Sequence, residues 1–245
     1  MQLEPTRHLP IEGTYNVRDL GGYATPAGQT QWRRLLRADA LHRLDGHGVE
    51  MLLTAGLTTV VDLRNAEELT YQPNPLNGHG GVVYHNVSLF DGLAPSRVDN
   101  GDLLLDLYKL ALVQRQPALA QVLQIIADAP AGAVLFHCTA GKDRTGIVAA
   151  LLLGIAGVDA AFIVEDYALT AGLIAPIVAD ITAGAVARGA DPASFGRLLA
   201  SDPSTMAATL AFIETEFGSI AAYVEQIGLD QAAVERLRNR LLGEF

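Results

Sequence analysis

The sequence predicts an α/β fold in which a mostly parallel central sheet is flanked by helices. Short apolar runs rich in β-branched residues alternate with helical stretches up to about residue 156, an order typical of parallel strands joined by crossover helices. The strand candidates are continuously apolar, as expected for strands buried on both faces. Beyond Val158 the pattern is helical throughout, which predicts a C-terminal helical layer.

Each element of the sheet region has a local justification. Asp45 can cap a helix that Gly56 ends, because an aspartate accepts hydrogen bonds from a first helical turn and glycine suits a helix end. The β-branched run over residues 58–61 predicts a buried strand that ends in polar Asp62 and Arg64. Strands are expected over residues 30–38, 58–61, 81–89 and 132–136, and helices over residues 45–55, 65–69, 102–115, 117–129 and from Arg144 onward.

The chain is expected to form one domain over residues 1–245, since it shows neither an internal repeat nor a low-complexity linker. Within its helical C-terminal third, residues 170–200 contain glycine and proline breaks. These breaks predict a helical lid over that range, which would open more readily than the helix after Arg144.

Composition excludes several classes of function. The net charge is −10, from 17 basic and 27 acidic residues, which argues against nucleic acid as a partner and against purely electrostatic docking on anionic lipid. A single cysteine cannot form an internal disulfide or a cysteine-rich metal cluster. The six histidines are scattered without an HExxH pairing, which argues against a zinc enzyme. We expect the protein to need neither a metal nor an organic cofactor.

Targeting signals are also missing from the sequence pattern. The N-terminal "MQLEPTRHLPIEG" is polar and has no apolar segment of the kind that a signal peptide needs. The run "IVAALLLGIAG" that starts at Ile147 spans about 11 residues, whereas a membrane-spanning helix needs roughly 20. We therefore expect a cytoplasmic protein without a stable membrane anchor.

The stretch "FHCTAGKDRTG" contains the single cysteine, Cys138, six residues before Arg144. A cysteine at a strand end, a glycine-containing turn and a following helix place several backbone N–H groups around one point, which favours an anion. The N–H groups of Thr139 to Arg144 are therefore candidate phosphate donors, and the Arg144 guanidinium adds a bidentate fork. The alternative for Cys138 is a small buried apolar residue.

The same surroundings favour a thiolate, because nearby positive charge stabilises the ionised sulfur. Phosphoryl transfer to cysteine needs an ionised sulfur, stabilisation of the equatorial oxygens and an acid for the leaving oxygen. Thr145 is placed to donate to the sulfur and to ease its later departure. His137 is expected to orient the loop through its ring N–H groups, unless it is simply a satisfied core histidine.

The stretch "HCTAGKDRTG" resembles the signature loop of cysteine-dependent protein tyrosine phosphatases. Its Lys-Asp pair is the variant of a bacterial tyrosine-phosphatase-like family that includes the mycobacterial PtpB-type enzymes, which act on phosphotyrosine, phosphoserine/threonine and phosphoinositides. The resemblance extends over nearly the whole chain through "NVRDLGGY", "TVVDLRNAEE", "VEDYALT" and "FIETEFGSIAAYVEQIGL". It implies a cysteine-phosphatase fold with a helical lid, makes Lys142 a second phosphate contact, and alone allows export by a route without a signal segment.

Two aspartates remain candidates for the general acid. The resemblance to the PtpB-type group points to Asp143, next to Arg144, which we prefer slightly. Asp91 lies in "LFDGLAP", at the place where ordinary tyrosine phosphatases carry a mobile acid loop, and it keeps the spacing to Pro95. The alternative for Asp91 is a turn residue beside Gly92.

Asp62 and Arg64 end a buried strand at the carboxyl edge, where α/β proteins bind ligands. They could bind substrate or brace the loop, and an internal ion pair is an equal alternative.

The sequence thus predicts a phosphomonoester hydrolase with a cysteinyl-phosphate intermediate, most simply a protein tyrosine phosphatase with dual-specificity or phosphoinositide activity. Its partners would be a phosphorylated peptide, lipid head group or small molecule, and phosphate- or vanadate-type anions should bind the loop. A phosphatase of a soluble nucleotide, sugar or antibiotic-precursor phosphate is the alternative within the same chemistry. A non-catalytic phosphate-binding module is the alternative of another class, although binding alone would not need the cysteine.

Overall fold

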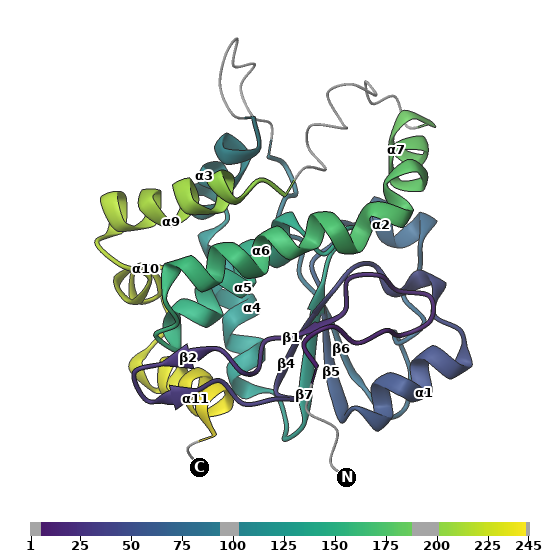
Figure 1. Ribbon diagram of the computed structural model, residues 1–245, viewed down its shortest axis with the longest axis horizontal. Coiled ribbons are helices and arrows are strands. Elements are labelled where there is room, and N and C mark those ends of the chain that lie inside the picture. The colour runs from purple at the N-terminus through teal and green to yellow at the C-terminus, as the bar shows by residue number, and fades with distance from the viewer. Residues whose placement is uncertain (1–5, 94–102, 188–200, 244–245) are drawn as a thin grey trace.

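The protein is described by a computed structural model over residues 6–93, 103–187 and 201–243. Five strands form a central sheet in the order β1-β4-β7-β5-β6 (Figure 1). Their bounds are β1 Arg18–Asp19, β4 Leu35–Ala38, β5 Leu57–Asp62, β6 Val83–Asn86 and β7 Ala133–His137. The pairs β4–β7, β7–β5 and β5–β6 are parallel and β1 is antiparallel to β4, so the predicted mostly parallel sheet is confirmed.

Two apolar cores lie on the two faces of the sheet. The central strand β7 shows why, because its side chains alternate: Val134 and Phe136 enter one core while Ala133 and Leu135 enter the other. The first core is filled by α3 (Leu103–Gln114), α4 (Gln116–Asp128) and α5 (Asp143–Ile155), and the second by α1 (Gly46–Thr54). A strand that feeds two cores must be apolar at every position, which explains the continuous run in the sequence.

The C-terminal third forms the predicted helical layer. Its helices are α6 (Ala160–Ile174), α7 (Val178–Ala187), α9 (Pro203–Phe217), α10 (Ile220–Gln226) and α11 (Gln231–Leu242). Helix α6 crosses in front of the sheet and leads to α7 (Figure 1). Because the sheet and this layer enclose α5, nearly every residue of α5 is buried, including the apolar run that starts at Ile147.

Local signals in the sequence set several helix boundaries. The Asp45 side chain accepts a hydrogen bond from the N–H of Gly48 at 2.9 Å and caps α1. Helix α2 (Ala66–Tyr71) opens with a capping box, in which Asn65 and Glu68 each accept from the other's backbone N–H. These side chains satisfy donors that a helix start would otherwise leave unpaired.

The strand predicted over residues 30–38 begins only at Leu35. The preceding segment turns, and Arg33 adopts a φ of 60°, in the left-handed region. Asp19 accounts for this turn, because its carboxylate accepts from the N–H groups of Arg33 and Gly21, each at 2.9 Å.

The start of the range 170–200, over which a lid was predicted, belongs to the folded core. Thr170 and Ile174 are fully buried, so α6 anchors the start of this range in the core. The chain continues through a 3₁₀ turn (Ala175–Ile177) into α7, and residues 188–200 lie outside the described residues. Ile174 and Ile177 share an apolar cluster with Ala140 of the cysteine loop, which places this segment directly against the loop.

One helical stretch among the described residues, Ala160–Ala187, is long and apolar enough to cross a membrane by length and composition alone. This stretch was not singled out from the sequence, because Glu165, Asp166 and Asp180 interrupt its apolar residues. In this structure the stretch packs on the fold, and Asp166 lies buried against arginines from the sheet.

Candidate active site

Cys138 lies directly after the central strand β7, and the loop that it begins ends at Asp143, the first residue of α5. The cysteine is free and 1% exposed. Gly141 turns the loop with a φ of +67°, and a Cβ atom there would lie 2.5 Å from the carbonyl oxygen of Ala38 on β4. The loop therefore requires glycine at this position, both for its conformation and for its approach to the neighbouring strand.

The carbonyl groups of four consecutive loop residues are bound from outside the loop. His137 Nδ1 lies 3.0 Å from the carbonyl oxygen of Cys138, and the N–H of Ala40 donates to that of Thr139 at 3.0 Å. Asn16 Nδ2 donates to that of Ala140 at 2.9 Å, and Arg37 Nη2 to that of Gly141 at 2.8 Å. In a planar trans peptide the N–H points opposite to the C=O. The N–H groups of residues 139–142 therefore face the inside of the loop, which forms an anion cradle.

A buried polar network holds these outer donors in place. Asp166 on α6 forms ion pairs with Arg18 on β1 and with Arg37 on β4, and all three side chains are at most 1% exposed. Arg18 also bonds the amide oxygen of Asn16, and Tyr23 donates to Asp166 at 2.9 Å. The loop is thus braced by three elements that are far apart in the sequence.

Charge in this network is shared between two cations and one carboxylate. Burial and the neighbouring Arg37 lower the pKa of Arg18 to about 10, although Asp166 opposes the change. Burial alone would raise the pKa of Asp166, but Arg18 and Arg37 outweigh burial and hold it well below its usual range. Asp166 therefore remains ionised and pairs with both arginines, of which Arg37 donates to the loop and Arg18 holds Asn16.

His137 is fully buried at the end of β7 and has polar groups on both sides of its ring. Its Nδ1 lies near the carbonyl of Cys138, and its Nε2 lies 2.9 Å from Asn74 Nδ2 and 3.1 Å from Asp62 Oδ2. Asp62 pairs with Arg64 at 2.7 Å, and neither side chain is exposed. Burial alone would raise the pKa of Asp62, but His137 and Arg64 outweigh burial and lower it. Asp62 and Arg64 therefore form a fully buried internal ion pair that contacts His137 at the start of the loop.

Arg144 is held by a carboxylate that the sequence did not reveal as a site residue. Glu68 of α2 accepts from Arg144 Nη1 at 2.6 Å and from Nη2 at 2.8 Å, and it also accepts from the hydroxyl of Thr139. Burial alone would raise the pKa of Glu68, but its bonds to Arg144 and Thr139 outweigh burial and lower it to about 2. The guanidinium is thereby fixed beside the cradle, with the ring of Phe90 centred 5.6 Å from it.

The two candidate acids occupy different surroundings. Asp143 belongs to the loop, where Tyr108 of α3 donates to its Oδ1 at 2.6 Å and Lys142 Nζ lies 3.1 Å from the same oxygen. The Lys142 side chain is fully buried, and its ammonium group contacts the carboxylate of Asp143 in the same loop. Asp91 is exposed and follows Phe90, which faces Arg144, while Pro95 lies outside the described residues.

The hydroxyl of Thr145 is buried and has no hydrogen-bond partner among residues 6–93, 103–187 and 201–243. The expected bond from Thr145 to the Cys138 sulfur is therefore not formed in this structure.

A groove of about 270 Å³ adjoins the loop at Thr139 and Glu68. Its walls carry the acidic Glu67 and Asp180 and the basic Arg43, whose Nη2 lies 3.7 Å from Asp180 Oδ2. Tyr71, another wall residue, is 67% exposed.

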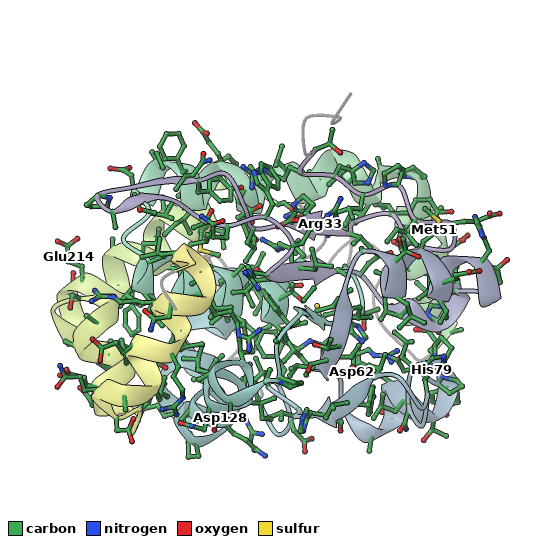
Figure 2. All side chains as sticks on the ribbon, turned by 90° about the horizontal axis from the view of Figure 1, so that it is seen from below. Arg33, Met51, Asp62, His79, Asp128 and Glu214 are labelled. Atoms are coloured by element: carbon green, nitrogen blue, oxygen red, sulfur yellow. The ribbon has the colours of Figure 1, made fainter. Side chains whose placement is uncertain are left out.

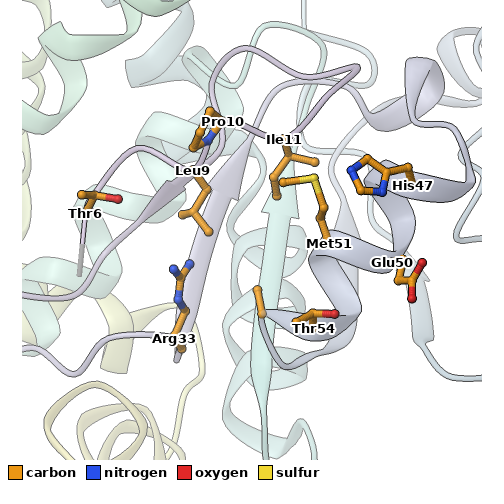
Figure 3. A pocket seen from close by; sticks show the side chains of 10 residues that line it. Thr6, Leu9, Pro10, Ile11, Arg33, His47, Glu50, Met51 and Thr54 are labelled. Carbon is orange, nitrogen blue, oxygen red and sulfur yellow. The ribbon is translucent and has the colours of Figure 1, made fainter. Parts of the chain in front are cut away.

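A larger cavity of about 620 Å³ lies between the N-terminal segment and α1, at the opposite edge of the sheet (Figure 3). Arg33 and Met51, which line it, are labelled in the view from below (Figure 2). None of its lining residues belongs to the cysteine loop. Among the described residues there is also no group of three or more His, Cys, Asp or Glu side chains that could hold a metal ion.

Comparison with known proteins agrees with this geometry. The sequence profile of the tyrosine phosphatase family matches residues 9–243. The chain belongs to the tyrosine phosphatase family. It is thus a cysteine-dependent phosphatase, as the resemblance of "HCTAGKDRTG" predicted.

Curated relatives extend over most of this phosphatase. A tyrosine-protein phosphatase of Nostoc commune is 35% identical over 218 residues, covering 84% of this chain and 73% of the relative. The triple specificity protein phosphatase PtpB of Mycobacterium tuberculosis is 29% identical, with 97% of this chain and 99% of the relative covered. The crystal structure of Pseudomonas aeruginosa TpbA matches with a TM-score of 0.37 and 22% identity over 69% of this chain and 86% of that one.

Several residues that support the loop of this phosphatase lie in the stretches that carried the resemblance, but the sequence did not assign them a role. Asn16 and Arg18 belong to "NVRDLGGY", Glu68 to "TVVDLRNAEE" and Asp166 to "VEDYALT". Their roles depend on contacts between these stretches, which a single sequence does not display. Tyr108 and Arg37 lie outside the quoted stretches.

Proposed function

We propose that this phosphatase hydrolyses phosphotyrosine in proteins through a cysteinyl-phosphate intermediate. The observation that carries the proposal is the cradle around Cys138, in which four outward carbonyls turn the N–H groups of residues 139–142 inward. Arg144 lies at the end of the same loop, held by Glu68. A binding module would need the cradle and the arginine, but not a buried cysteine at its centre.

In the first step the Cys138 thiolate attacks phosphorus and the bond from phosphorus to the tyrosyl oxygen breaks. The loop N–H groups and Arg144 stabilise the equatorial oxygens, and Asp143 gives its proton to the leaving phenolate oxygen. Water then attacks the phosphocysteine, Asp143 takes up a proton from that water, and the thiolate leaves with inorganic phosphate as product. Thr145 donates its unpaired hydroxyl to the departing sulfur.

Charge around the site supports a protein substrate over a polyphosphorylated lipid. The groove beside the loop is lined by more carboxylates than cations, since Asp39, Glu67, Glu68 and Asp180 face a single arginine, Arg43, and the net charge of the chain is −10. Additional phosphates on an inositol ring would be repelled there. The buried Lys142 ammonium contacts Asp143, so it offers these phosphates little compensation. We expect phosphoserine and phosphothreonine as slower substrates and phosphoinositides as the slowest.

The test is phosphate release from a panel containing a phosphotyrosine peptide, a phosphoserine peptide, phosphoinositides, and nucleotide and sugar phosphates. Each substrate is assayed with the wild-type protein and with Cys138→Ser. We expect release from the phosphotyrosine peptide to be fastest and to disappear in Cys138→Ser, while vanadate still binds the variant.

Other outcomes would contradict the proposal in distinct ways. Fast release from soluble nucleotide or sugar phosphates alone would retain the chemistry and overturn the substrate. Vanadate binding without turnover of any substrate would identify a binding module, and turnover that survives in Cys138→Ser would overturn the intermediate.

A further inference from the structure

We propose that Tyr108 is a positioning residue, which holds the carboxyl group of Asp143 so that its second oxygen faces the leaving group. The inference rests on the proposed function, in which Asp143 is the general acid. It adds a residue on α3, a helix that contributes nothing else to the catalytic loop in the scheme above.

Residues of three helices form a chain of hydrogen bonds that ends at the carboxyl group of Asp143. Asp143 is the first residue of α5, Tyr108 lies on α3 and Tyr167 on α6. The hydroxyl of Tyr108 lies 2.6 Å from Asp143 Oδ1 and 2.9 Å from the hydroxyl of Tyr167. The two rings are buried and meet edge to face, with centroids 6.3 Å apart and planes at 87°.

Counting hydrogens fixes the direction of this chain of bonds. A phenol has one hydrogen to donate. Since Tyr108 donates to the carboxylate of Asp143, the bond between the two tyrosines must use the hydrogen of Tyr167. The order is therefore Tyr167 to Tyr108 to Asp143, and each donor orients the next group.

The contacts also assign the acidic proton to one oxygen. Tyr108 and Lys142 Nζ both contact Oδ1 of Asp143, at 2.6 Å and 3.1 Å. An oxygen facing two donors stays an acceptor, so the proton of the neutral acid belongs on Oδ2. With Oδ1 fixed, rotation of the carboxyl group is blocked and Oδ2 keeps a constant orientation toward the leaving group.

Two further observations favour a fixed donor over a chance contact. Burial and the adjacent Asp143 raise the pKa of Tyr108 well above its usual value, so its hydroxyl keeps its hydrogen at any working pH. Gly146 lies one turn after Asp143, and a Cβ there would be 3.1 Å from the ring of Tyr167. Helix α5 therefore approaches Tyr167 closely because residue 146 has no side chain.

The experiment compares substrates that differ in their need for an acid. Phenyl phosphate releases a poor leaving group and depends on proton donation, whereas p-nitrophenyl phosphate releases a good one. We expect Tyr108→Phe to lower kcat about tenfold on phenyl phosphate and less than about twofold on p-nitrophenyl phosphate, as partial loss of a general-acid effect predicts. KM and vanadate affinity should stay unchanged.

Tyr223→Phe is the matched control. Tyr223 is also fully buried, and its hydroxyl donates to the carbonyl of Leu112 on the same helix α3 at 2.8 Å, without contacting Asp143. It should change both substrates by the same factor. Should Tyr108→Phe not fold, Tyr167→Phe removes the hydrogen that orients Tyr108 and should show the same substrate ratio in weaker form.

Equal losses on both substrates, or no loss in a folded Tyr108→Phe or Tyr167→Phe protein, would overturn the inference. Asp143→Asn separates it from the proposed function. If Asp143→Asn lowers kcat by the same factor on phenyl phosphate and on p-nitrophenyl phosphate while turnover still requires Cys138, Asp143 is not the acid. The positioning role is then wrong and the phosphatase chemistry stands. If turnover does not require Cys138, the proposed function itself fails.

Discussion

Replacing Asp166 by asparagine is expected to destabilise the protein by about 4–5 kcal/mol. Removing one partner of a buried ion pair costs about 3–5 kcal/mol, because an uncompensated charge stays buried. Asp166 faces two such charges, Arg18 and Arg37, and all three side chains are at most 1% exposed. This doubling puts the expected loss in the upper half of the range. Asparagine has nearly the same volume and can still accept from Tyr23, so a cavity adds little.

Urea unfolding followed by the fluorescence of Trp32, the single tryptophan, measures this loss. Asp128→Asn is the matched control, since Asp128 pairs with Arg236 at 2.9 Å but the two side chains are 54% and 44% exposed. An exposed pair contributes at most about 1 kcal/mol. If Asp166→Asn cost no more than Asp128→Asn, the two buried arginines would not depend on the carboxylate, and the brace described for the loop would be refuted.

Two other predictions concern the loop itself. Gly141→Ala should abolish vanadate binding and turnover in a protein that still has its secondary structure by circular dichroism, because the added Cβ meets the backbone of Ala38 at 2.5 Å; retained vanadate binding would contradict this. Glu68→Gln should lower kcat/KM about tenfold by releasing Arg144, whereas Glu67→Gln on the same helix should have little effect. Since the pKa of Glu68 falls from its usual 4.5 to about 2 on folding, its contribution to stability is present above pH 4.5 and is lost as pH falls toward 2. Urea unfolding in that pH window should show a smaller loss in Glu68→Gln, and equal pH dependence in both proteins would refute the ion pair's role.

Much of the fold was predictable because its signals are local. The continuously apolar run of β7 and the Asp45 cap each depend on a few neighbouring residues. The mostly parallel sheet followed from the alternation of strands and helices, whereas the order of its strands came only from the structure. The length of β4 was overestimated, because the carboxylate of Asp19, 14 residues earlier, accepts a hydrogen bond from the N–H of Arg33 and holds that residue in a turn.

The residues at the centre of the site are close together in the sequence, whereas the residues that hold the loop in place are not. Cys138 and Arg144 fall within seven residues, so their shared loop could be recognised directly. Arg37 and Asp166 are 129 residues apart, and the residues next to either of them do not predict their ion pair. Glu68 could be predicted as part of a helix start, but its bond to Arg144 requires the strand that places α2 beside the loop. Residues that act through long-range contacts therefore escaped prediction.

The solitary, buried Cys138 has a consequence for oxidative stress. A sulfenic acid formed on a catalytic cysteine is commonly rescued by a neighbouring thiol, which converts it to a disulfide before further oxidation. These 245 residues contain no second thiol. Within the chain, only a backbone nitrogen of the loop is left to trap the sulfenic acid as a sulfenamide, and otherwise an external thiol must do so. The burial that leaves the sulfur 1% exposed is then its main protection against irreversible oxidation.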